Sequence, residues 1–398
     1  MGMHVTENPA IRSGRETAPR KLFVLSGKRG GFGAMVPMMR CIEEDPDLEL
    51  QLVLTDQHLS EQFGKTIAEV ERYFKVAATV DMEQNGSEGA ERSKAIARCM
   101  YKMTDVLDEL APDICLVYGD RGEAMATALA ATNLGIPIAH IQGGDLSGSV
   151  DDQIRHAITK LAHLHFASTE QSGERIRRMG EDAWRVHVVG DNHVDTIVNG
   201  EFADAGTVAS ELGIDLTQPV VIVLQHSETT EPEKAYDQMS ATLRAVRTAG
   251  RQAVVIYPCS DVGYEGILKA IDQYAVGDSF VVRKNLDAHL FLGLMNVAGV
   301  LVGNSSAGII EARYFGLPSV NIGRRQLGRE RGATVISVDH SEREILEAIN
   351  KSLSDEVFRR TIETSPKIYG DGFAGKRIVS IIKETELGDG LWKKRMAY

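Results

Sequence analysis

Two adjacent aspartates, Asp151 and Asp152, follow a glycine-rich loop and begin a helix-length segment that also carries Arg155. The loop comes after a short apolar run that leads into Gln142. A helix N-terminus needs one capping carboxylate, so two carboxylates beside a polar loop exceed that structural requirement. Neighbouring carboxylates in a cleft have pKa values that are pushed apart, which suits them to donate and accept a proton. We therefore predict that these residues take part in proton transfer at a carbon atom.

Other charged side chains stand directly after apolar runs of strand length. Asp120 and Arg121 follow the run 113–118, and His226 follows a run that ends at Gln225. The carboxyl ends of parallel strands open into the crevice where α/β proteins bind ligands. A structural explanation stays open for Asp120, as a helix cap, and for His226, as an ordinary hydrogen-bonded polar residue. Their strand-end positions favour roles in catalysis or in phosphate binding.

A phosphate site is predicted where a strand runs into a helix through the sequence GNSSAG. Ser305 and Ser306 stand at the start of that helix, where hydroxyls and free backbone N–H groups bind phosphate. Glu311 follows within reach of a ribose hydroxyl, and Arg325 lies in an arginine-rich stretch after the next apolar run. Arg29 belongs to a second glycine-rich segment, SGKRGGFG, which by itself fits a plain turn equally well.

The elements that must position these residues follow a regular order. Short β-branched runs alternate with helix-length amphipathic stretches, which is typical of parallel α/β folds. We predict strands at 21–26, 50–55, 113–118, 136–141, 164–167 and 186–189, and then at 220–225, 253–257, 299–302 and 319–322. We predict helices between them, among others at 91–110, 123–134, 153–162, 232–249, 287–298 and 307–315.

Both halves of the chain repeat this order, so we predict an α/β protein with two Rossmann-like lobes that face each other across a cleft. The expected boundaries are a flexible tail at 1–20, a first lobe at 21–198 and a second, phosphate-binding lobe at 199–375. The polar stretch 199–218 is the predicted linker. We expect the last segment, 376–398, to contain a helix that packs back on the first lobe.

Composition limits the classes of function. The chain has 398 residues, 43% hydrophobic and 25% charged, as expected for a two-domain globular protein. A net charge of −12 argues against nucleic acid as a partner but not against a small anionic ligand. The apolar runs are far shorter than the roughly 20 residues of a membrane helix. The first 20 residues are polar and four cysteines are scattered, so we expect a cytoplasmic protein without a membrane anchor. No histidine and carboxylate spacing predicts a metal site.

Taken together, the motifs resemble those of the UDP-N-acetylglucosamine 2-epimerase family. GDR, HIQGGDLSGSVDDQIRHAITKLAH, QH, GNSSAGIIE and GLPSVNIGRRQLGRE occur in the order that the family shows, and the resemblance extends from Lys21 to about Ile382. The SGS and RHAITKLAH patterns are most similar to the hydrolysing branch. That branch includes bacterial enzymes of sialic-acid synthesis and the epimerase half of a bifunctional animal enzyme.

The resemblance implies a glycosyltransferase-B-like arrangement, no cofactor and no metal. It implies anti elimination of UDP with loss of the C2 proton, and then hydration of the glycal to N-acetylmannosamine. It also implies a homodimer or a homotetramer. Carried onto matching positions, the acid/base and sugar-positioning set comprises Asp120, Gln142, Asp151 and Asp152, with His226 at the departing phosphate. The UDP-binding set comprises Arg29, Arg121, Ser305, Ser306, Arg325 and, at the ribose, Glu311.

Two departures from the family pattern leave alternatives open. Gln142 stands where close relatives carry the glutamate of HIEGGE, and Gly31 replaces an aspartate in the first loop. A glutamine keeps shape and hydrogen bonding but cannot transfer a proton, so Gln142 is either an engineered substitution or a change tied to another substrate or mechanism. The alternatives are a non-hydrolysing epimerase, a glycosyltransferase of the same architecture, and a catalytically impaired sugar-nucleotide-binding protein. A 2,4-diacetamido sugar nucleotide is an alternative substrate.

Overall fold

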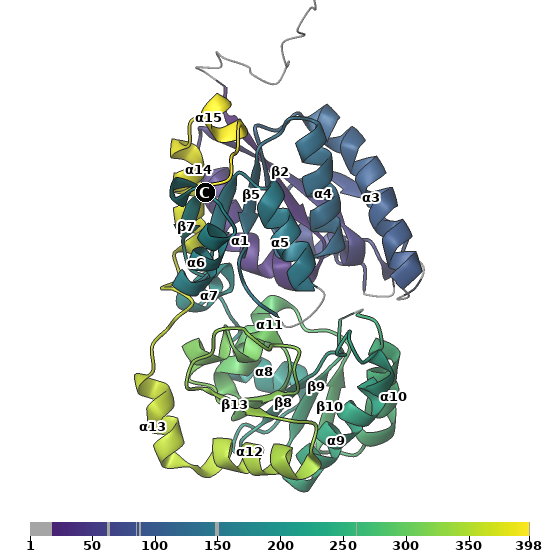
Figure 1. The fold of residues 1–398 in the computed structure, drawn as a ribbon. Helices are drawn as coiled ribbons and strands as arrows, with labels where there is room; N and C mark the ends of the chain where they lie inside the picture. The colour runs from purple at the N-terminus through teal and green to yellow at the C-terminus, as the bar shows by residue number, and fades with distance from the viewer. Residues whose placement is uncertain are drawn as a thin grey trace, which may run out of the picture.

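The structure is a computed structural model that describes residues 18–61, 64–84, 86, 89–147, 151–259 and 261–397, apart from the side chain of Arg29. The chain folds into two α/β lobes, drawn one above the other in Figure 1. Each lobe is built on a parallel sheet with helices on both faces. The predicted fold class, two Rossmann-like lobes, is therefore confirmed.

The first lobe contains seven strands within the described residues, all parallel. Their order across the sheet is β3 (Val76–Val80), β2 (Leu48–Thr55), β1 (Arg20–Ser26), β4 (Ile114–Tyr118), β5 (Ile138–Ile141), β6 (Leu164–Ala167) and β7 (Val186–Val188). Parallel strands covered on both faces are apolar at every position. On β1, Phe23 and Val24 are both fully buried and belong to the hydrophobic cores on opposite faces of the sheet.

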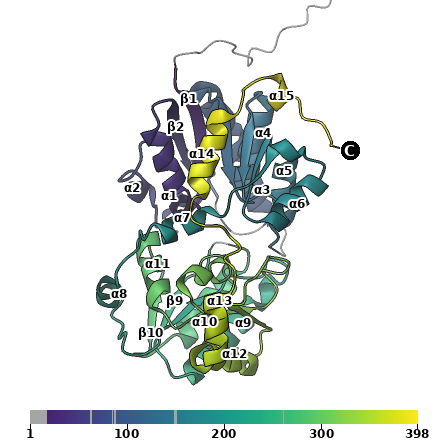
Figure 2. The same ribbon diagram turned by 90° about the vertical axis from the view of Figure 1, so that its left-hand side faces the viewer.

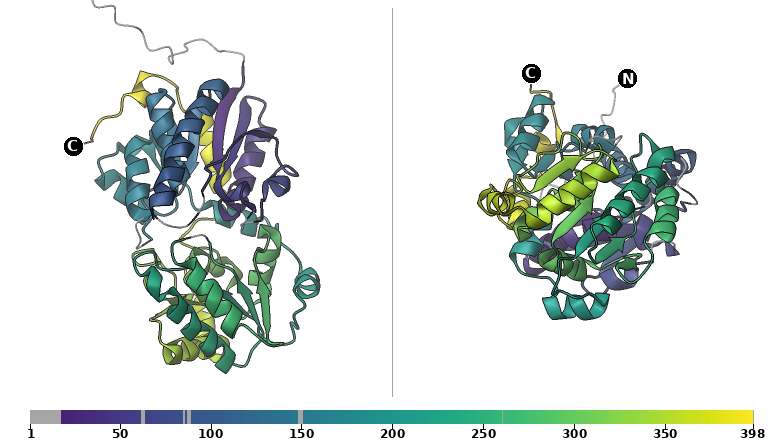
Figure 3. Two further views of the ribbon diagram at one scale, coloured as in Figure 1. Left: turned by 90° about the vertical axis from the view of Figure 1, so that its right-hand side faces the viewer. Right: turned by 90° about the horizontal axis from the view of Figure 1, so that it is seen from below.

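Helices cover both faces of the first sheet. Figure 2 shows α1 (Arg29–Glu44) and α14 (Ala374–Glu384) over one face, and Figure 3 shows the opposite face with α3 (Gly89–Leu110) and α4 (Gly122–Asn133). A hydrophobic core lies between the sheet and each pair of helices. The remaining helices of this lobe are α2 (Ile67–Val70), α5 (Asp151–Leu161), α6 (Glu170–Arg178), α7 (Asn192–Val198) and α15 (Asp389–Trp392).

The second lobe repeats this plan on six parallel strands of the described chain. Their order is β10 (Phe280–Arg283), β9 (Ala253–Ile256), β8 (Val221–Leu224), β11 (Val300–Gly303), β12 (Ser319–Ile322) and β13 (Val335–Val338). Its helices are α8 (Ala205–Leu212), α9 (Ala235–Thr248), α10 (Tyr264–Tyr274), α11 (Ala288–Val297), α12 (Glu342–Ser354) and α13 (Glu356–Thr364). Alternate residues of β8 again face two separate cores.

The chain ends on the lobe where it began. After α13 it leaves the second lobe, and α14 packs against α1 and α7 of the first (Figures 1 and 2). The packing is close, because a Cβ on Gly375 would lie 2.9 Å from the backbone of Met38. Asp195 on α7 accepts hydrogen bonds from the backbone N–H groups of Ala374 and Gly375 at the start of α14.

The predicted elements differ from the structure mainly at the edges of the two sheets and in one predicted helix. The strands β3, β10 and β13, which lie at sheet edges with half-exposed residues, were not predicted although most of their residues are apolar. The predicted helix 307–315 is instead two short 3-10 turns, Ser306–Gly308 and Ala312–Phe315. Its side chains are buried nearly all round, so the amphipathic spacing of an α-helix is missing. No helix in the described residues is long and apolar enough to span a membrane.

Candidate active site

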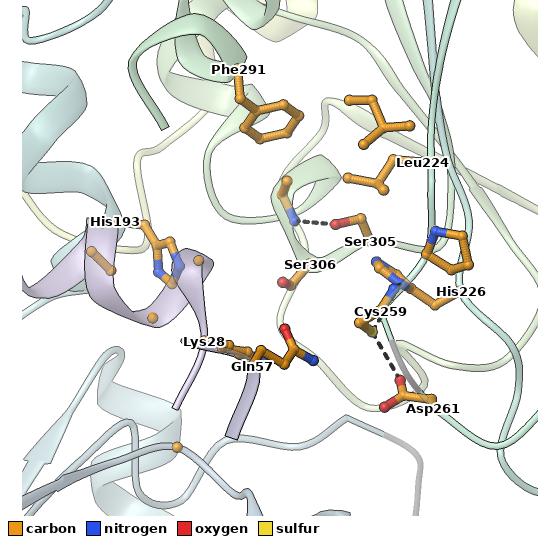
Figure 4. A pocket seen from close by; sticks show the side chains of 18 of the residues that line it. Lys28, Gln57, His193, Leu224, His226, Cys259, Asp261, Phe291, Ser305 and Ser306 are labelled. Atoms are coloured by element: carbon orange, nitrogen blue, oxygen red, sulfur yellow. Dashed lines mark hydrogen bonds between the residues drawn. The ribbon is translucent and has the colours of Figure 1, made fainter. Parts of the chain in front are cut away.

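A pocket of about 710 Å³ lies between the loops at the carboxyl ends of the two sheets. It brings together most of the residues predicted from the sequence: Asp120, Arg121, Gln142, Asp151, His226, Ser305, Ser306, Glu311 and Arg325. Asp152 is absent from the described lining, and the side chain of Arg29 lies outside the described part of the chain. Figure 4 shows the pocket with His193 on one side and His226 on the other.

Asp120 is held at the end of β4 by Arg155. The buried guanidinium of Arg155, near the start of α5, forms an ion pair with Asp120 and donates to the carbonyl of Asp145 at 2.9 Å. Burial alone would raise the pKa of Asp120, but the positive charge of Arg155 brings that pKa below its ordinary value. Asp120 is therefore an ionised carboxylate with a fixed orientation.

The predicted aspartate pair divides into two different environments. Asp151 lines the pocket. The Oδ1 atom of Asp152 accepts hydrogen bonds from the backbone N–H and the hydroxyl of Ser147, both at 2.7 Å, and from Arg155 at 3.0 Å. Asp152 thus fixes the loop before α5 and orients the arginine that holds Asp120.

Arginines from the two lobes meet at Asp261, a residue that sequence reasoning missed. Arg121 of the first lobe and Arg325 of the second each lie 3.4 Å from its carboxylate. Burial would raise the pKa of Asp261, but Arg325 and Arg121 lower it well below its ordinary value. Arg121 also faces Asp56 at 3.2 Å and Glu123 at 3.6 Å. This side of the pocket is therefore lined with paired charges, with three carboxylates around Arg121 and one beside Arg325.

His226 is a neutral hydrogen-bond donor at the end of β8. Its Nδ1 atom accepts the backbone N–H of Cys259 at 3.0 Å, so its proton lies on Nε2. Burial, together with the positive charge of Arg325, lowers the pKa of His226 to about 3. Asn304 fixes the backbone of His226 through two hydrogen bonds, of 2.7 and 2.9 Å. Gly303 permits this contact, because a Cβ there would meet the carbonyl oxygen of Leu224 at 2.0 Å.

Ser305 and Ser306 stand at the turn that follows β11. The hydroxyl of Ser305 accepts the backbone N–H of Ala307 at 3.3 Å and so caps the first 3-10 turn. Glu311 lies deeper in the same segment, where burial raises the pKa of its carboxyl group. Ser305 and Ser306 line the pocket, and Arg325 donates to the carbonyl of Asn304 in the same turn at 3.3 Å. Hydroxyls, backbone N–H groups and an arginine at such a turn are the groups that bind phosphate.

One end of the pocket is apolar and belongs to the second lobe. The residues that line it are Leu224, Ile256, Pro258, Leu286 and Phe291. Figure 4 shows Leu224 and Phe291 near Ser305. These side chains provide an apolar surface beside the polar turn at Ser305. The pocket therefore combines an apolar subsite, a site for negative charge and a region rich in carboxylates.

A further group in the pocket was not predicted from the sequence. His193, on α7, lines the pocket, and its Nδ1 atom lies 2.8 Å from Asp191 and 3.1 Å from the hydroxyl of Tyr118. The side-chain amide of Gln142 donates to the same aspartate at 2.6 Å. The signal was present, since Asp191 and His193 follow the predicted strand 186–189, as Asp120 follows its own strand.

Other histidines of the first lobe have structural roles. His163 accepts the backbone N–H of Ile138 at 3.1 Å and stacks on Trp392, and His165 contacts Glu181 at 3.1 Å. Within the described part of the chain, no group of three or more histidine, cysteine, aspartate or glutamate side chains is placed to hold a metal ion.

Comparisons with known proteins agree with this arrangement. The family model UDP-N-acetylglucosamine 2-epimerase matches residues 40–383. A Legionella pneumophila protein named UDP-N,N'-diacetylbacillosamine 2-epimerase (hydrolyzing) is 31% identical over 95% of this chain and 100% of its own. A Neisseria meningitidis UDP-N-acetylglucosamine 2-epimerase is 32% identical over 84% of this chain and 88% of its own. The fold matches a crystal structure of UDP-GlcNAc 2-epimerase from Neisseria meningitidis bound to UDP-GlcNAc, with a TM-score of 0.79 and 19% identity over 92% and 100% of the two chains. The chain belongs to the UDP-N-acetylglucosamine 2-epimerase family.

Proposed function

We propose that the protein is a hydrolysing 2-epimerase. It converts UDP-N-acetylglucosamine, or a close 2-acetamido sugar nucleotide, and water into UDP and a free sugar of the N-acetylmannosamine type. The observation that carries this proposal is one pocket in which the first lobe supplies carboxylates and an imidazole while the second supplies a phosphate-binding turn. A hydrolysing relative that is 31% identical over nearly the whole chain supports the same reaction.

The second lobe binds the UDP part of the substrate in this proposal. The uracil lies against the apolar side chains around Phe291, and Glu311 accepts a hydrogen bond from the ribose. Ser305 and Ser306 donate to the diphosphate, and Arg325 lies beside them. The sugar then extends toward Asp120 and Gln142 of the first lobe.

The reaction starts with elimination. A base removes the C2 proton, the electrons of the C2–H bond form a C1=C2 double bond, and UDP leaves from C1. His226 donates its Nε2 proton in a hydrogen bond to the departing phosphate, a role that suits an imidazole whose pKa is about 3. Water then adds across the double bond, and its hydroxyl group bonds to C1. A proton is added to C2 on the face opposite to the one from which the first proton was removed, which inverts C2.

Asp120 and Asp151 orient the sugar and transfer protons in the hydration step. The ionised state of Asp120 beside Arg155 suits it to hold the sugar hydroxyls or to stabilise positive charge at C1. Asp152 acts indirectly, because its hydrogen bonds to Ser147 and Arg155 fix the loop and the arginine around the sugar.

Proton NMR in deuterated water, without added metal, tests the proposal. We expect UDP and a free 2-acetamido sugar that carries deuterium at C2. Formation of UDP-N-acetylmannosamine without free sugar would overturn the proposal and indicate a non-hydrolysing epimerase. Binding of UDP without any exchange at C2 would indicate a sugar-nucleotide-binding protein, and transfer of an unepimerised sugar to an acceptor would indicate a glycosyltransferase.

The same experiment also identifies which sugar nucleotide the protein prefers. The Legionella relative is named for UDP-N,N'-diacetylbacillosamine and the Neisseria relative for UDP-N-acetylglucosamine, at 31% and 32% identity. UDP-N-acetylglucosamine and its 2,4-diacetamido counterpart are therefore assayed side by side. The ratio of their kcat/KM values identifies the preferred substrate.

A further inference from the structure

Gln142 is held in a costly conformation by two hydrogen bonds. Its φ angle is 62°, in the left-handed region that non-glycine residues seldom occupy. Its backbone N–H donates to the carbonyl of Phe166 at 2.9 Å, and its Nε2 atom donates to Oδ2 of Asp191 at 2.6 Å. An amide neither accepts nor releases a proton in catalysis. Gln142 therefore serves as a fixed donor to Asp191.

Asp191 is a buried carboxylate with both oxygens hydrogen-bonded. Oδ2 accepts from Gln142 and from the hydroxyl of Ser168 at 2.9 Å. Oδ1 accepts from the backbone N–H of His193 at 3.0 Å and lies 2.8 Å from its Nδ1 atom. Burial would raise the pKa of Asp191, but the hydrogen bonds, chiefly that of His193, lower it to about 2. Asp191 is therefore an anion directly behind the imidazole.

The anion determines which nitrogen of His193 carries the proton. An ionised carboxylate accepts hydrogen bonds and cannot donate them, so Nδ1 of His193 bears the proton and Nε2 presents a lone pair. The side chain of His193 is 21% exposed and lines the pocket, whereas that of Asp191 is fully buried. The hydroxyl of Tyr118 lies 3.1 Å from the same Nδ1 atom and restricts rotation of the ring.

Three other ionisable groups of the pocket, Asp120, Asp261 and His226, are less suited to remove the C2 proton. Asp120 is paired with Arg155, and Asp261 is shared between Arg121 and Arg325. His226 carries its proton on Nε2, because its Nδ1 atom accepts the N–H of Cys259. The arginines thus lower the basicity of the two carboxylates, and Nε2 of His226 carries a proton in place of a lone pair.

We propose that His193 is the base that removes the C2 proton, with Asp191 and Gln142 as the residues that position and polarise it. The proposal rests on the proposed function and names the group that performs its first step. In that step an N–H bond forms at Nε2 as the C2–H bond breaks. The electron pair of C2–H becomes the C1=C2 double bond, and the pair of the C1–O bond leaves with UDP. Asp191 stabilises the imidazolium that results.

The charges around His193 favour its acting as a base. Burial lowers the pKa of His193, but Glu311 and then Asp191 raise it, so that it lies above the ordinary value of 6.5. Lys28 opposes this effect, and Tyr118 faces the ring as a neutral phenol. The imidazole must be neutral to accept a proton, so kcat/KM falls as the pH falls through the pKa of His193.

Replacement of His193 by asparagine tests the assignment. Asparagine keeps a donor toward Asp191 but has no lone pair in place of Nε2. We expect the rates of C2 deuterium exchange and UDP release to fall about 100-fold or more, the usual range for a general base, while the Kd for UDP stays within about threefold. His289→Asn is the matched control, because His289 is exposed and outside the pocket lining.

Chemical rescue separates a base from a residue that only shapes the site. Free imidazole added to His193→Ala should restore part of the C2 exchange, with a rate that rises as imidazole deprotonates. Exchange in His193→Asn within threefold of wild type, or no rescue of a folded His193→Ala that still binds UDP, would overturn the role of His193 and leave the epimerase proposal standing. No UDP release by the wild type with either sugar nucleotide would overturn both proposals.

Discussion

The two sides of the pocket use their polar groups differently. The first-lobe side comprises Asp120, Gln142, Asp191 and His193, and the second-lobe side comprises His226, Ser305, Ser306 and Arg325. On the first-lobe side each side chain is fixed by another side chain, as in the pairs of Asp120 with Arg155 and of Asp191 with His193. On the second-lobe side the polar side chains are held mainly by hydrogen bonds to backbone atoms, as the imidazole of His226 is by the N–H of Cys259.

The difference has a chemical consequence. A proton transfer needs a side chain with a set orientation and a set protonation state, which a network of side chains provides. A diphosphate is bound by N–H groups, hydroxyls and an arginine, and its affinity tolerates small shifts of each donor. We therefore expect changes on the first-lobe side to reduce turnover and changes on the second-lobe side to reduce binding.

The largest effect is expected from Asp120→Asn. Asparagine keeps the shape of the side chain but removes the charge beside Arg155. We expect kcat for UDP release to fall about 100-fold or more, with little change in the Kd for UDP. Asp108→Asn, on an exposed position of α3, is the control. Equal losses in kcat and in UDP affinity would contradict the division between the two sides.

An exchange of the carboxylate and the amide between positions 142 and 191 tests the hydrogen-bond network of Gln142, Asp191 and His193. Asp191→Asn removes the anion behind His193, so the pKa of His193 falls and we expect kcat to drop on the order of 100-fold. Gln142→Glu alone places two carboxylates 2.6 Å apart, which raises the pKa of one of them and also lowers kcat. The double variant restores one anion and one amide in hydrogen-bond contact. We expect it to recover at least tenfold over Asp191→Asn, measured as UDP release.

Recovery of UDP release by the double variant distinguishes energetic coupling of positions 142 and 191 from two independent losses of activity. Two independent disruptions would multiply, so that the double variant would be the slowest of the three. A double variant slower than both single variants would show that Gln142 and Asp191 do not act as one unit. Thermal unfolding of all three variants controls for loss of the fold, because Asp191 also caps α7.

Much of the fold was readable from the sequence because its central strands are buried and mostly apolar. The strands β6 and β12 match their predicted bounds, whereas β3 and β10, half-exposed at the sheet edges, were not predicted although most of their residues are apolar. The predicted linker 199–218 contains α8. Edge elements depend on contacts made after folding, which local patterns do not record.

The site was predictable where a functional residue directly follows a central strand, as Asp120 and Gln142 do. The contact between Gln142 and Asp191 was not predictable in the same way. These residues follow β5 and β7, which lie on either side of β6, and they are 49 positions apart in the chain. Asp191 also caps α7, so its sequence context reads as an ordinary helix start.

On the second-lobe side, Arg325→Gln is expected to weaken binding. Arg325 contacts Asp261 at 3.4 Å, donates to the carbonyl of Asn304 at 3.3 Å and lines the pocket. Loss of one charged donor costs about 1.4 kcal/mol, so the Kd for UDP should rise about tenfold by calorimetry. Arg324→Gln is a close control, because Arg324 is adjacent to Arg325 in the chain, is exposed and lies outside the pocket lining. A tenfold fall in kcat at saturating substrate with unchanged Kd would place Arg325 in the chemical step instead.

The smallest effect concerns acid stability of the first lobe. His140 donates to the carbonyl of Gly119, directly before Asp120, and burial lowers its pKa and that of His163 to about 3. In the unfolded chain both titrate near 6.5, so below that pH the unfolded state binds more protons and stability falls as the pH falls toward 3.

His163→Gln makes this linkage measurable. A glutamine oxygen can still accept the N–H of Ile138, which Nδ1 of His163 accepts at 3.1 Å, but it does not titrate. Between pH 6.5 and 5.5 the wild type should lose roughly 1 kcal/mol more unfolding free energy than the variant, in urea titrations at the two pH values. His289→Gln, at an exposed position outside the pocket lining, is the matched control and should lose as much as the wild type. Equal losses in all three proteins would mean that the first lobe admits a proton to His163 without unfolding. The strands beneath the first-lobe side of the pocket would then be less rigid than its hydrogen bonds imply.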